Sequence, residues 1–143
     1  MPADFFFDSS VLLYLLSPDD SRANITENLL SQGGTISVQV LNEFAAVARR
    51  KTRMPWNQIE DALADIRLLC ETPVAITVAI HEAGLRVAKR YGFHLYDSMI
   101  IAAALESECK VLYSEDMQHG QAIGSLTVRN PFPKRKATPS RPA

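Results

Sequence analysis

The sequence has few cysteines, with only Cys70 and Cys109 among its 143 residues. The two lie far apart in the chain, without the short spacing of a zinc site, and two cysteines are too few for a disulfide scaffold. A chain of this length can bury a core without such staples. We therefore expect both side chains to be buried thiols in the reducing cytoplasm.

Long apolar runs and a surplus of charge are also missing. The longest uninterrupted apolar run, from Met99 to Leu105, is too short to span a bilayer. The aromatic run from Phe5 to Phe7 has acids on both sides instead of the basic flank of a signal peptide, so we expect no membrane segment. The formal net charge is -1. The chain as a whole therefore has no excess of positive charge that would indicate a nucleic-acid partner, although a local basic patch could still bind one. The three histidines show no HxxxH or HExxH pattern, and none is assigned to a metal.

Short apolar strands alternate with helical periods along the chain. This alternation is typical of an α/β domain around a parallel sheet. Strands are expected over 5–7, 35–38, 74–76, 111–113 and 125–128. Helices are expected over 11–16, 21–31 and 39–51. A fourth helix should follow a capping box formed by Asn57 and Glu60, and a fifth should begin after Thr77 as its N-cap and end at Gly92. A sixth should follow Asp97, which is a possible N-cap.

The folded domain is expected to cover residues 1–130. From Pro131 onward, prolines and basic residues replace the core-forming types. Residues 131–143 are therefore predicted to form a flexible tail. Its cations Lys134, Arg135 and Lys136 could contact a partner, or the tail could serve only as a solvated end.

Four acids occur where expected elements meet. Asp8 and Asp116 follow two buried-type strands, and ligands in open parallel sheets bind beyond such carboxyl ends. Asp97 lies at a helix entrance and Glu43 on the apolar side of the 39–51 helix. Two carboxylates about 4 Å apart repel by roughly 4 kcal/mol at an effective dielectric of 20. The cluster therefore needs protons or a divalent cation, and oxygen ligands favour Mg²⁺ or Mn²⁺.

Two of these acids also have ordinary structural explanations. Aspartate is a preferred N-cap, so Asp97 could simply cap its helix. Glu43 could pair with a buried arginine. Neither residue taken alone therefore indicates a functional site.

Four segments carry a resemblance to a known family: FFFDSSVLLYLL, SVQVLNEF, YGFHLYDSMIIAAA and VLYSED. In this order and at these separations they resemble the four motifs of the PIN-domain nucleases, and more narrowly the ribonuclease toxins of the VapBC type. The resemblance extends from about Asp4 to Val128. It implies a three-layer α/β/α sandwich with a mainly parallel central sheet and an endoribonuclease dependent on Mg²⁺ or Mn²⁺. It further implies inhibition by a small antitoxin encoded beside it, and a homodimer.

The resemblance also assigns roles to residues. It implies that Asp8, Glu43, Asp97 and Asp116 are the catalytic, metal-binding acids, and that Ser10 and Ser114 are supporting hydroxyls. Glu115 is a departure, because it places a second acid beside Asp116. Asp116 is favoured, since the hydroxyl two residues before it is then Ser114. Water activated by the metal would hydrolyse the RNA phosphodiester. The basic residues after Glu43 could bind the RNA backbone or form a solvated helix end; they are Arg49, Arg50, Lys51 and Arg53.

Other classes of protein fit less well. A haloacid-dehalogenase-like phosphatase needs a second aspartate two residues after the first, where this chain has Ser10. A receiver domain needs paired acids after its first strand and a lysine after its last, and neither is in the expected place. A non-catalytic PIN-like scaffold that binds RNA or protein is the remaining alternative. Its sign would be a lost acid, and none of the four is missing.

Overall fold

Three consecutive phenylalanines form the strand on which the sheet is built. In the computed structural model, which describes residues 4–134, strand β1 (Phe5–Phe7) pairs in parallel with β2 (Val111–Tyr113). Strand β2 pairs in parallel with β4 (Leu126–Arg129), and β3 (Ala122–Ile123) closes that edge antiparallel to β4. The strand order is therefore β1-β2-β4-β3. Phe6 and Leu112 are partners across the first pair, and both are fully buried, as expected for strands covered on both faces.

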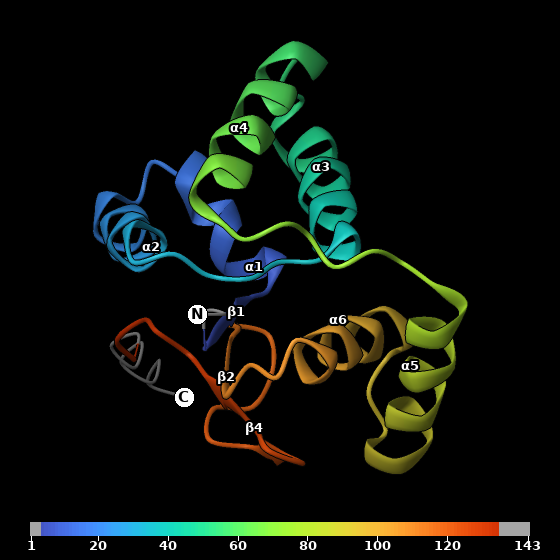
Figure 1. Ribbon diagram of the computed structural model, residues 1–143. Coiled ribbons are helices and arrows are strands. Elements are labelled where there is room, and N and C mark those ends of the chain that lie inside the picture. Colours follow the sequence, from blue (N-terminus) through green and yellow to red (C-terminus); the bar gives the residue numbers. More distant parts are fainter. Residues whose placement is uncertain (1–3, 135–143) are drawn as a thin grey trace, which may run out of the picture.

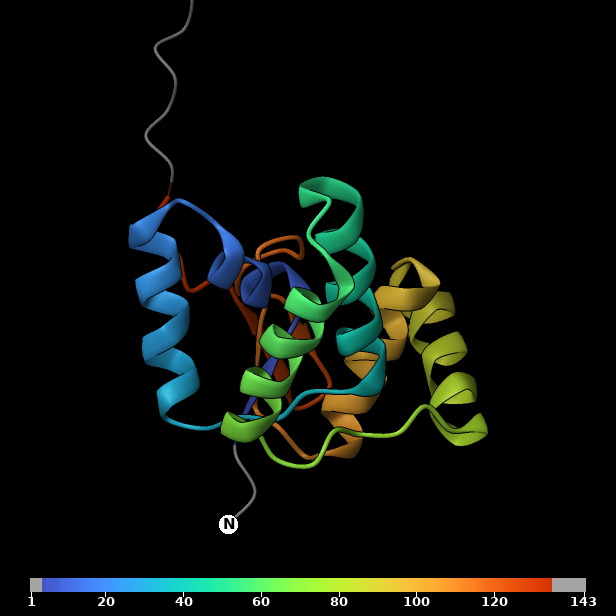
Figure 2. The ribbon, with the colours of Figure 1, turned by 90° about the horizontal axis from the view of Figure 1, so that it is seen from above.

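The helices lie on both sides of these strands. Figure 1 shows α1 to α4 above the sheet and α5 and α6 as a pair beside it, and Figure 2 shows the same arrangement from above. The chain is thus a three-layer α/β/α domain around a mainly parallel sheet, which confirms the predicted fold class. The helices in chain order are α1 (Ser9–Leu12), the 3-10 helix η1 (Leu13–Leu16), α2 (Asp20–Ser31), α3 (Val38–Thr52), α4 (Trp56–Leu69), α5 (Val78–Tyr91) and α6 (Leu95–Glu106).

Two predicted strands are shorter than expected. The segments 35–38 and 74–76 form only isolated parallel bridges, one between Phe6 and Thr35 and one between Ser37 and Val74. Ser37 is the N-cap of α3, and its hydroxyl accepts a hydrogen bond from the Val40 amide. The chain therefore turns into a helix directly after the bridge, which leaves no length for a strand.

Helix α6 is buried on nearly every face, as its apolar sequence predicts. Ser98 to Ala104 are all buried, and α5 packs along it. Gly84 of α5 permits this close approach, because a Cβ there would lie 2.9 Å from Met99 Cγ. The first turn of α6, which carries the predicted site residue Asp97, is therefore anchored by a rigid, buried element.

The predicted helix ends are partly right. The Thr77 hydroxyl accepts from the Ile80 amide at the start of α5, and Gly92 ends that helix with a φ of 80°. The capping box at Asn57 is wrong, because α4 begins at Trp56 with Pro55 as its N-cap residue. The N-cap reading of Asp97 is also wrong: α6 begins at Leu95, with His94 in the capping position, so Asp97 lies inside the first turn.

The remaining sequence predictions concern cysteines, membrane segments and the tail. Both cysteines are thiols; Cys109 is buried, but Cys70 is only half-buried. Within residues 4–134, no helix is both long and apolar enough to cross a membrane. Phe132, assigned to the tail, is buried, and its ring packs edge-on against Tyr14 at 4.7 Å. The tail cations Arg135 and Lys136 lie outside the described residues.

Candidate active site

Asp8 is the most buried of the four predicted acids, with an exposed fraction of 2%. It follows β1 directly, and its amide donates to the Tyr113 carbonyl at 2.9 Å. Although it occupies the N-cap position of α1, its side chain makes no capping hydrogen bond. Instead its Oδ2 accepts from the hydroxyls of Ser10, at 2.9 Å, and Ser114, at 2.8 Å. The parallel pairing of β1 and β2 thus brings Ser114 to the first acid, and Ser10 reaches it from the first turn of α1.

The Asp8 carboxyl is in an environment that disfavours its charge. Its pKa is raised from 3.8 to about 6, mainly by burial and in smaller part by the negative charges of Asp97 and Asp116. The two serine hydroxyls act in the opposite direction, because they donate to the ionised form. The fold therefore holds this carboxylate in place while leaving its charge largely uncompensated.

Glu43 reaches the same region from the side, on α3. The Ser9 hydroxyl donates to its Oε2 at 3.2 Å. Burial is the main cause that raises the Glu43 pKa, and the charge of Asp8 is the second. Within residues 4–134 Glu43 forms no ion pair with an arginine, so the expectation of a structural pair is wrong.

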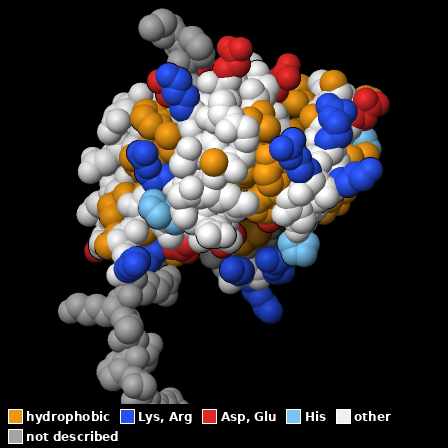
Figure 3. All heavy atoms as spheres, turned by 90° about the horizontal axis from the view of Figure 1, so that it is seen from below, with side chains coloured by type: hydrophobic (Ala, Val, Ile, Leu, Met, Phe, Trp, Pro, Cys, Tyr) orange, Lys and Arg blue, Asp and Glu red, His pale blue; other side chains and the backbone are white. Residues whose placement is uncertain are grey.

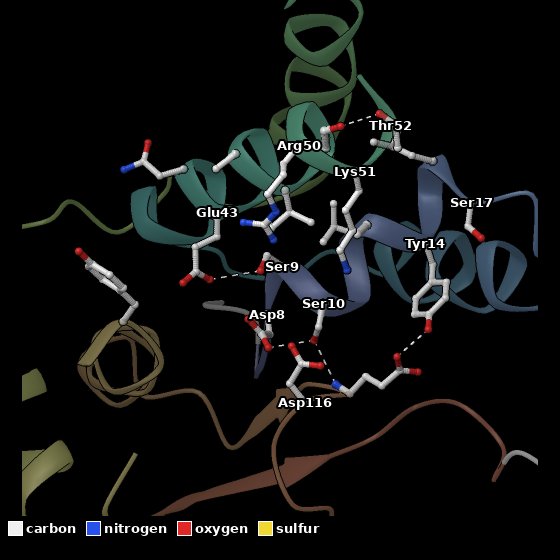
Figure 4. A pocket seen from close by; sticks show the side chains of 18 of the residues that line it. Asp8, Ser9, Ser10, Tyr14, Ser17, Glu43, Arg50, Lys51, Thr52 and Asp116 are labelled. Carbon is white, nitrogen blue, oxygen red and sulfur yellow. Dashed lines mark hydrogen bonds between the residues drawn. The ribbon is translucent and has the colours of Figure 1, made fainter. Parts of the chain in front are cut away.

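Asp97 and Asp116 complete the set of acids. Asp97 is half-buried, and its pKa is raised first by burial and then by the charge of Asp116, while His94 lowers it. Asp116 is exposed and follows β2. All four acids line one cavity of about 910 Å³, between α1, α3 and α6 (Figure 4). This volume is at the upper end of the range for ligand pockets.

Glu115, the neighbouring acid, also lines this cavity, but its carboxylate has protein partners. Its carboxylate forms an ion pair with Arg22 and accepts from the Tyr14 hydroxyl at 2.6 Å. The Arg22 guanidinium lies over the rings of Tyr14 and Phe132, at 5.2 and 4.9 Å from their centroids. The Glu115 amide donates to Ser10 Oγ at 3.1 Å. The Glu115 carboxylate is thus engaged by Arg22 and Tyr14, whereas Asp116 forms no ion pair within residues 4–134.

Sequence reasoning missed the contributions of Tyr14 and Arg22. Arg22 is buried on α2 and meets Glu115 only through the tertiary fold, across 93 positions of sequence. No local pattern marks such a pair. The one signal in the sequence is that two acids, Glu115 and Asp116, are adjacent. Their like charges suggest that one of them pairs with a cation from another part of the chain.

The donor set fits a hard divalent cation. Carboxylate side chains from four segments line one cavity, and the pKa values of three of the acids are raised, mainly by burial and in part by the charges of the other acids. Within residues 4–134, no three acidic, histidine or cysteine side chains meet closely enough to enclose an ion. Mg²⁺ commonly keeps several waters and takes only one or two protein carboxylates, so this spacing suits it.

Comparisons with known proteins identify the fold. The PIN domain profile matches residues 5–122. VapC20 of Mycobacterium tuberculosis, described as a sarcin-ricin loop cleaving toxin, has a crystal structure that matches with a TM-score of 0.64 and 20% identity over 78% of this chain and 89% of that one. A toxin–antitoxin complex from Klebsiella pneumoniae matches with a TM-score of 0.67 and 20% identity, over 89% and 97% of the two chains.

A third solved structure has the same fold. VapBC2 of Rickettsia felis, bound to a DNA fragment from its promoter, matches with a TM-score of 0.63 and 16% identity, over 87% and 96% of the two chains. No curated protein matches this chain. All three identities are below 25%, so these likenesses establish the fold and nothing beyond it.

Proposed function

The chain belongs to the PIN-domain family, and from this premise we propose that it is a metal-dependent endoribonuclease, the toxin of a toxin–antitoxin pair. The observation that carries the proposal is the convergence of Asp8, Glu43, Asp97 and Asp116 on one cavity at the ends of β1 and β2. Within residues 4–134 none of these four acids forms an ion pair, and such a concentration of negative charge is costly unless a cation binds there.

In the proposed site, Asp8 and Asp97 are the central ligands of Mg²⁺ or Mn²⁺. Glu43 and Asp116 complete the site directly or through water. A bound ion of this kind supplies a water molecule of lowered pKa and positive charge for the leaving oxygen of a phosphodiester. Ser10 and Ser114 hold the Asp8 carboxylate in a fixed orientation. No histidine or lysine is needed as a base, because the nucleophile is activated by the ion.

The partners of the protein follow from the same family membership. Two of the solved structures with this fold are toxin–antitoxin complexes, which supports an antitoxin as the partner of this chain. A homodimer and a cytoplasmic location belong to the same proposal. The alternative, a non-catalytic scaffold that binds RNA or protein, would retain the fold without needing the four acids.

The deciding experiment is cleavage of a mixed pool of structured and single-stranded RNAs by the purified protein in Mg²⁺, Mn²⁺ or EDTA. Asp8→Asn and Asp97→Asn are tested beside it, with Asp65→Asn as a matched control, because Asp65 is exposed on α4 away from the cavity. We expect cleavage that requires the metal, disappears in the two site variants and persists in the control.

Two other results would speak against the proposal. Cleavage that persists in Asp8→Asn would remove the site as described. A protein that neither cleaves RNA nor gains thermal stability from Mn²⁺ would favour the scaffold, because a ligand that binds only the native state raises its stability.

A further inference from the structure

The last turn of α3 carries three consecutive cations, and they do not share one environment. Arg50 and Lys51 line the same cavity as the four acids. Figure 4 shows both side chains extending from α3 into the cavity, toward Ser9 and Ser10. Arg49 does not line it. The basic run that follows Glu43 in sequence is therefore divided by the fold into residues that face the site and residues that do not.

Arg49 has a structural role that accounts for its charge. Its Nη1 donates to the Met54 carbonyl at 2.9 Å, beyond the end of α3, and its guanidinium lies 5.1 Å from the centroid of the Trp56 ring. It thus ties the end of α3 to the start of α4. A cation near a helix C-terminus is also favoured by the helix dipole. These two effects explain Arg49 completely.

Arg50 and Lys51 have no comparable explanation. Within residues 4–134 neither side chain forms an ion pair or a hydrogen bond, although five carboxylates line the same cavity. Neither cation is among the groups that shift the pKa values of Asp8, Glu43 and Asp97, so neither acts as a counter-charge to these acids. The helix dipole favours a positive charge near the end of α3 whichever way the side chain points. It therefore does not explain why these two side chains enter the cavity.

A cavity with acids on one wall and unpaired cations on another suits a particular ligand. An anion bound between the walls would contact the cations directly, and the acids through a divalent ion. A phosphodiester has this chemistry, since it binds both metal ions and the side chains of arginine and lysine. On the face in Figure 3, basic side chains lie in several separate groups with apolar and polar atoms between them.

We infer that Arg50 and Lys51 form a phosphate-binding subsite that holds the RNA backbone beside the scissile bond. The inference rests on the proposed ribonuclease function and extends it to two residues that hold the substrate. Arg50 can contact a phosphate with two parallel N–H donors, whereas Lys51 contributes a compact charge. Both contacts are to the backbone, so they strengthen binding without selecting a base sequence.

The test measures binding separately from cleavage. The full chain carrying Asp97→Asn, which is expected not to cleave, is titrated with a fluorescein-labelled oligouridylate of twelve nucleotides in Mg²⁺ over a range of salt concentrations. Adding Arg50→Gln and Lys51→Gln removes two phosphate contacts. The slope of log K against log salt should then become less steep by about 1.4, and binding at 0.1 M salt should weaken by about 25-fold.

Arg49→Gln is the matched control, because it removes the same charge from the same helix turn outside the cavity. It should leave the salt slope close to that of the parent. Arg50 and Lys51 are exposed, so their variants should fold, and thermal unfolding checks this. With Asp97 intact, the Arg50→Gln/Lys51→Gln protein should cleave RNA with a raised KM and a kcat changed much less.

The outcomes separate this inference from the proposed function. If the wild type cleaves RNA but the double variant keeps the parent salt slope and KM, the subsite is refuted and the nuclease function stands. An equal loss in Arg49→Gln would indicate a general field and would also refute the subsite. If the wild type neither binds nor cleaves any RNA, the proposed function fails and the subsite fails with it.

Discussion

Replacing the Asp8 carboxylate with an amide should stabilise the protein in the absence of divalent ions. The pKa of this carboxyl is raised to about 6 in the folded chain, mainly by burial. The folded state therefore binds the proton more tightly than the unfolded state does. The resulting stability is fully present below the unfolded pKa of 3.8 and is lost as the pH rises through about 6. An amide in the same position does not ionise, so it avoids this loss.

The expected size follows from the pKa shift. At about 1.36 kcal/mol per pKa unit, the rise from 3.8 to about 6 corresponds to about 3 kcal/mol of stability lost by the wild type at pH 8. The oxygen of the asparagine amide can still accept from Ser10 and Ser114, so Asp8→Asn should recover much of that amount. At pH 8 the variant should melt roughly 6 to 9 °C higher than the wild type, given about 3 °C per kcal/mol for a chain of this size.

The assay is urea unfolding of wild type and Asp8→Asn in EDTA at pH 8, pH 6 and pH 4, with Asp65→Asn as the control for a surface charge. The gain in midpoint should be largest at pH 8 and small at pH 4, where the wild-type carboxyl is protonated in the folded state and partly protonated in the unfolded state. Adding Mn²⁺ at 100 times its dissociation constant should stabilise the wild type by about 2.7 kcal/mol and the variant much less.

One pattern would refute this reasoning. If Asp8→Asn were less stable than the wild type at pH 8 in EDTA, the buried carboxylate would be stabilised by its surroundings and not penalised by them. A gain of equal size at pH 4 and pH 8 would show that the effect is one of packing, unrelated to ionisation.

Three further changes test other parts of the structure. Arg22→Met should cost about 3 kcal/mol in urea unfolding, because it leaves the Glu115 carboxylate without its partner; adding Glu115→Gln should recover part of the loss, and no recovery would show that the charge is not the cause. Gly84→Ala should lower the melting temperature, because its Cβ would lie 2.9 Å from Met99 Cγ and overpacking costs about 1–3 kcal/mol; an unchanged melting temperature would show that Met99 can move aside. The Cys70 thiol, whose pKa burial raises to about 11, should react with iodoacetamide far more slowly at pH 7.5 than a free thiol, and fast labelling would contradict its burial.

The positions of the acids could be anticipated because they depend on regular features of the chain. Asp8 and Ser114 follow strands that pair in parallel, and such strands end at the same edge of a sheet. Glu43 interrupts the apolar side of a helix whose period is visible in sequence. The placement of these residues depends on the periods of the helices and strands and on the order of the strands. The sequence pattern predicts both without knowledge of individual side-chain contacts.

Other features depend on tertiary contacts that no local pattern records. The choice between Glu115 and Asp116 depends on Arg22, which lies on a distant helix. The two-residue strand β3 is too short to show any alternation, and it exists only because β4 supplies its partner. The separation of Arg49 from Arg50 and Lys51 depends on where α3 ends relative to Trp56. In each case the environment of the residue depends on a contact with a distant part of the chain, which sequence spacing does not predict.

The Arg22 ion pair bears on how the acidic cavity retains its charge. Arg22 is the one buried arginine among residues 4–134, and its two ion pairs go to Asp19 and Glu115. Had its guanidinium reached Asp116 instead, that carboxylate would have a fixed counter-ion, and a divalent cation would have to displace it in order to bind. Glu115 therefore occupies the one buried arginine of this region, and the carboxylates that face the cavity remain available to a cation from solution. On this argument Glu115→Gln should weaken Mn²⁺ binding by freeing Arg22 to approach Asp116, although Glu115 itself does not contact the ion.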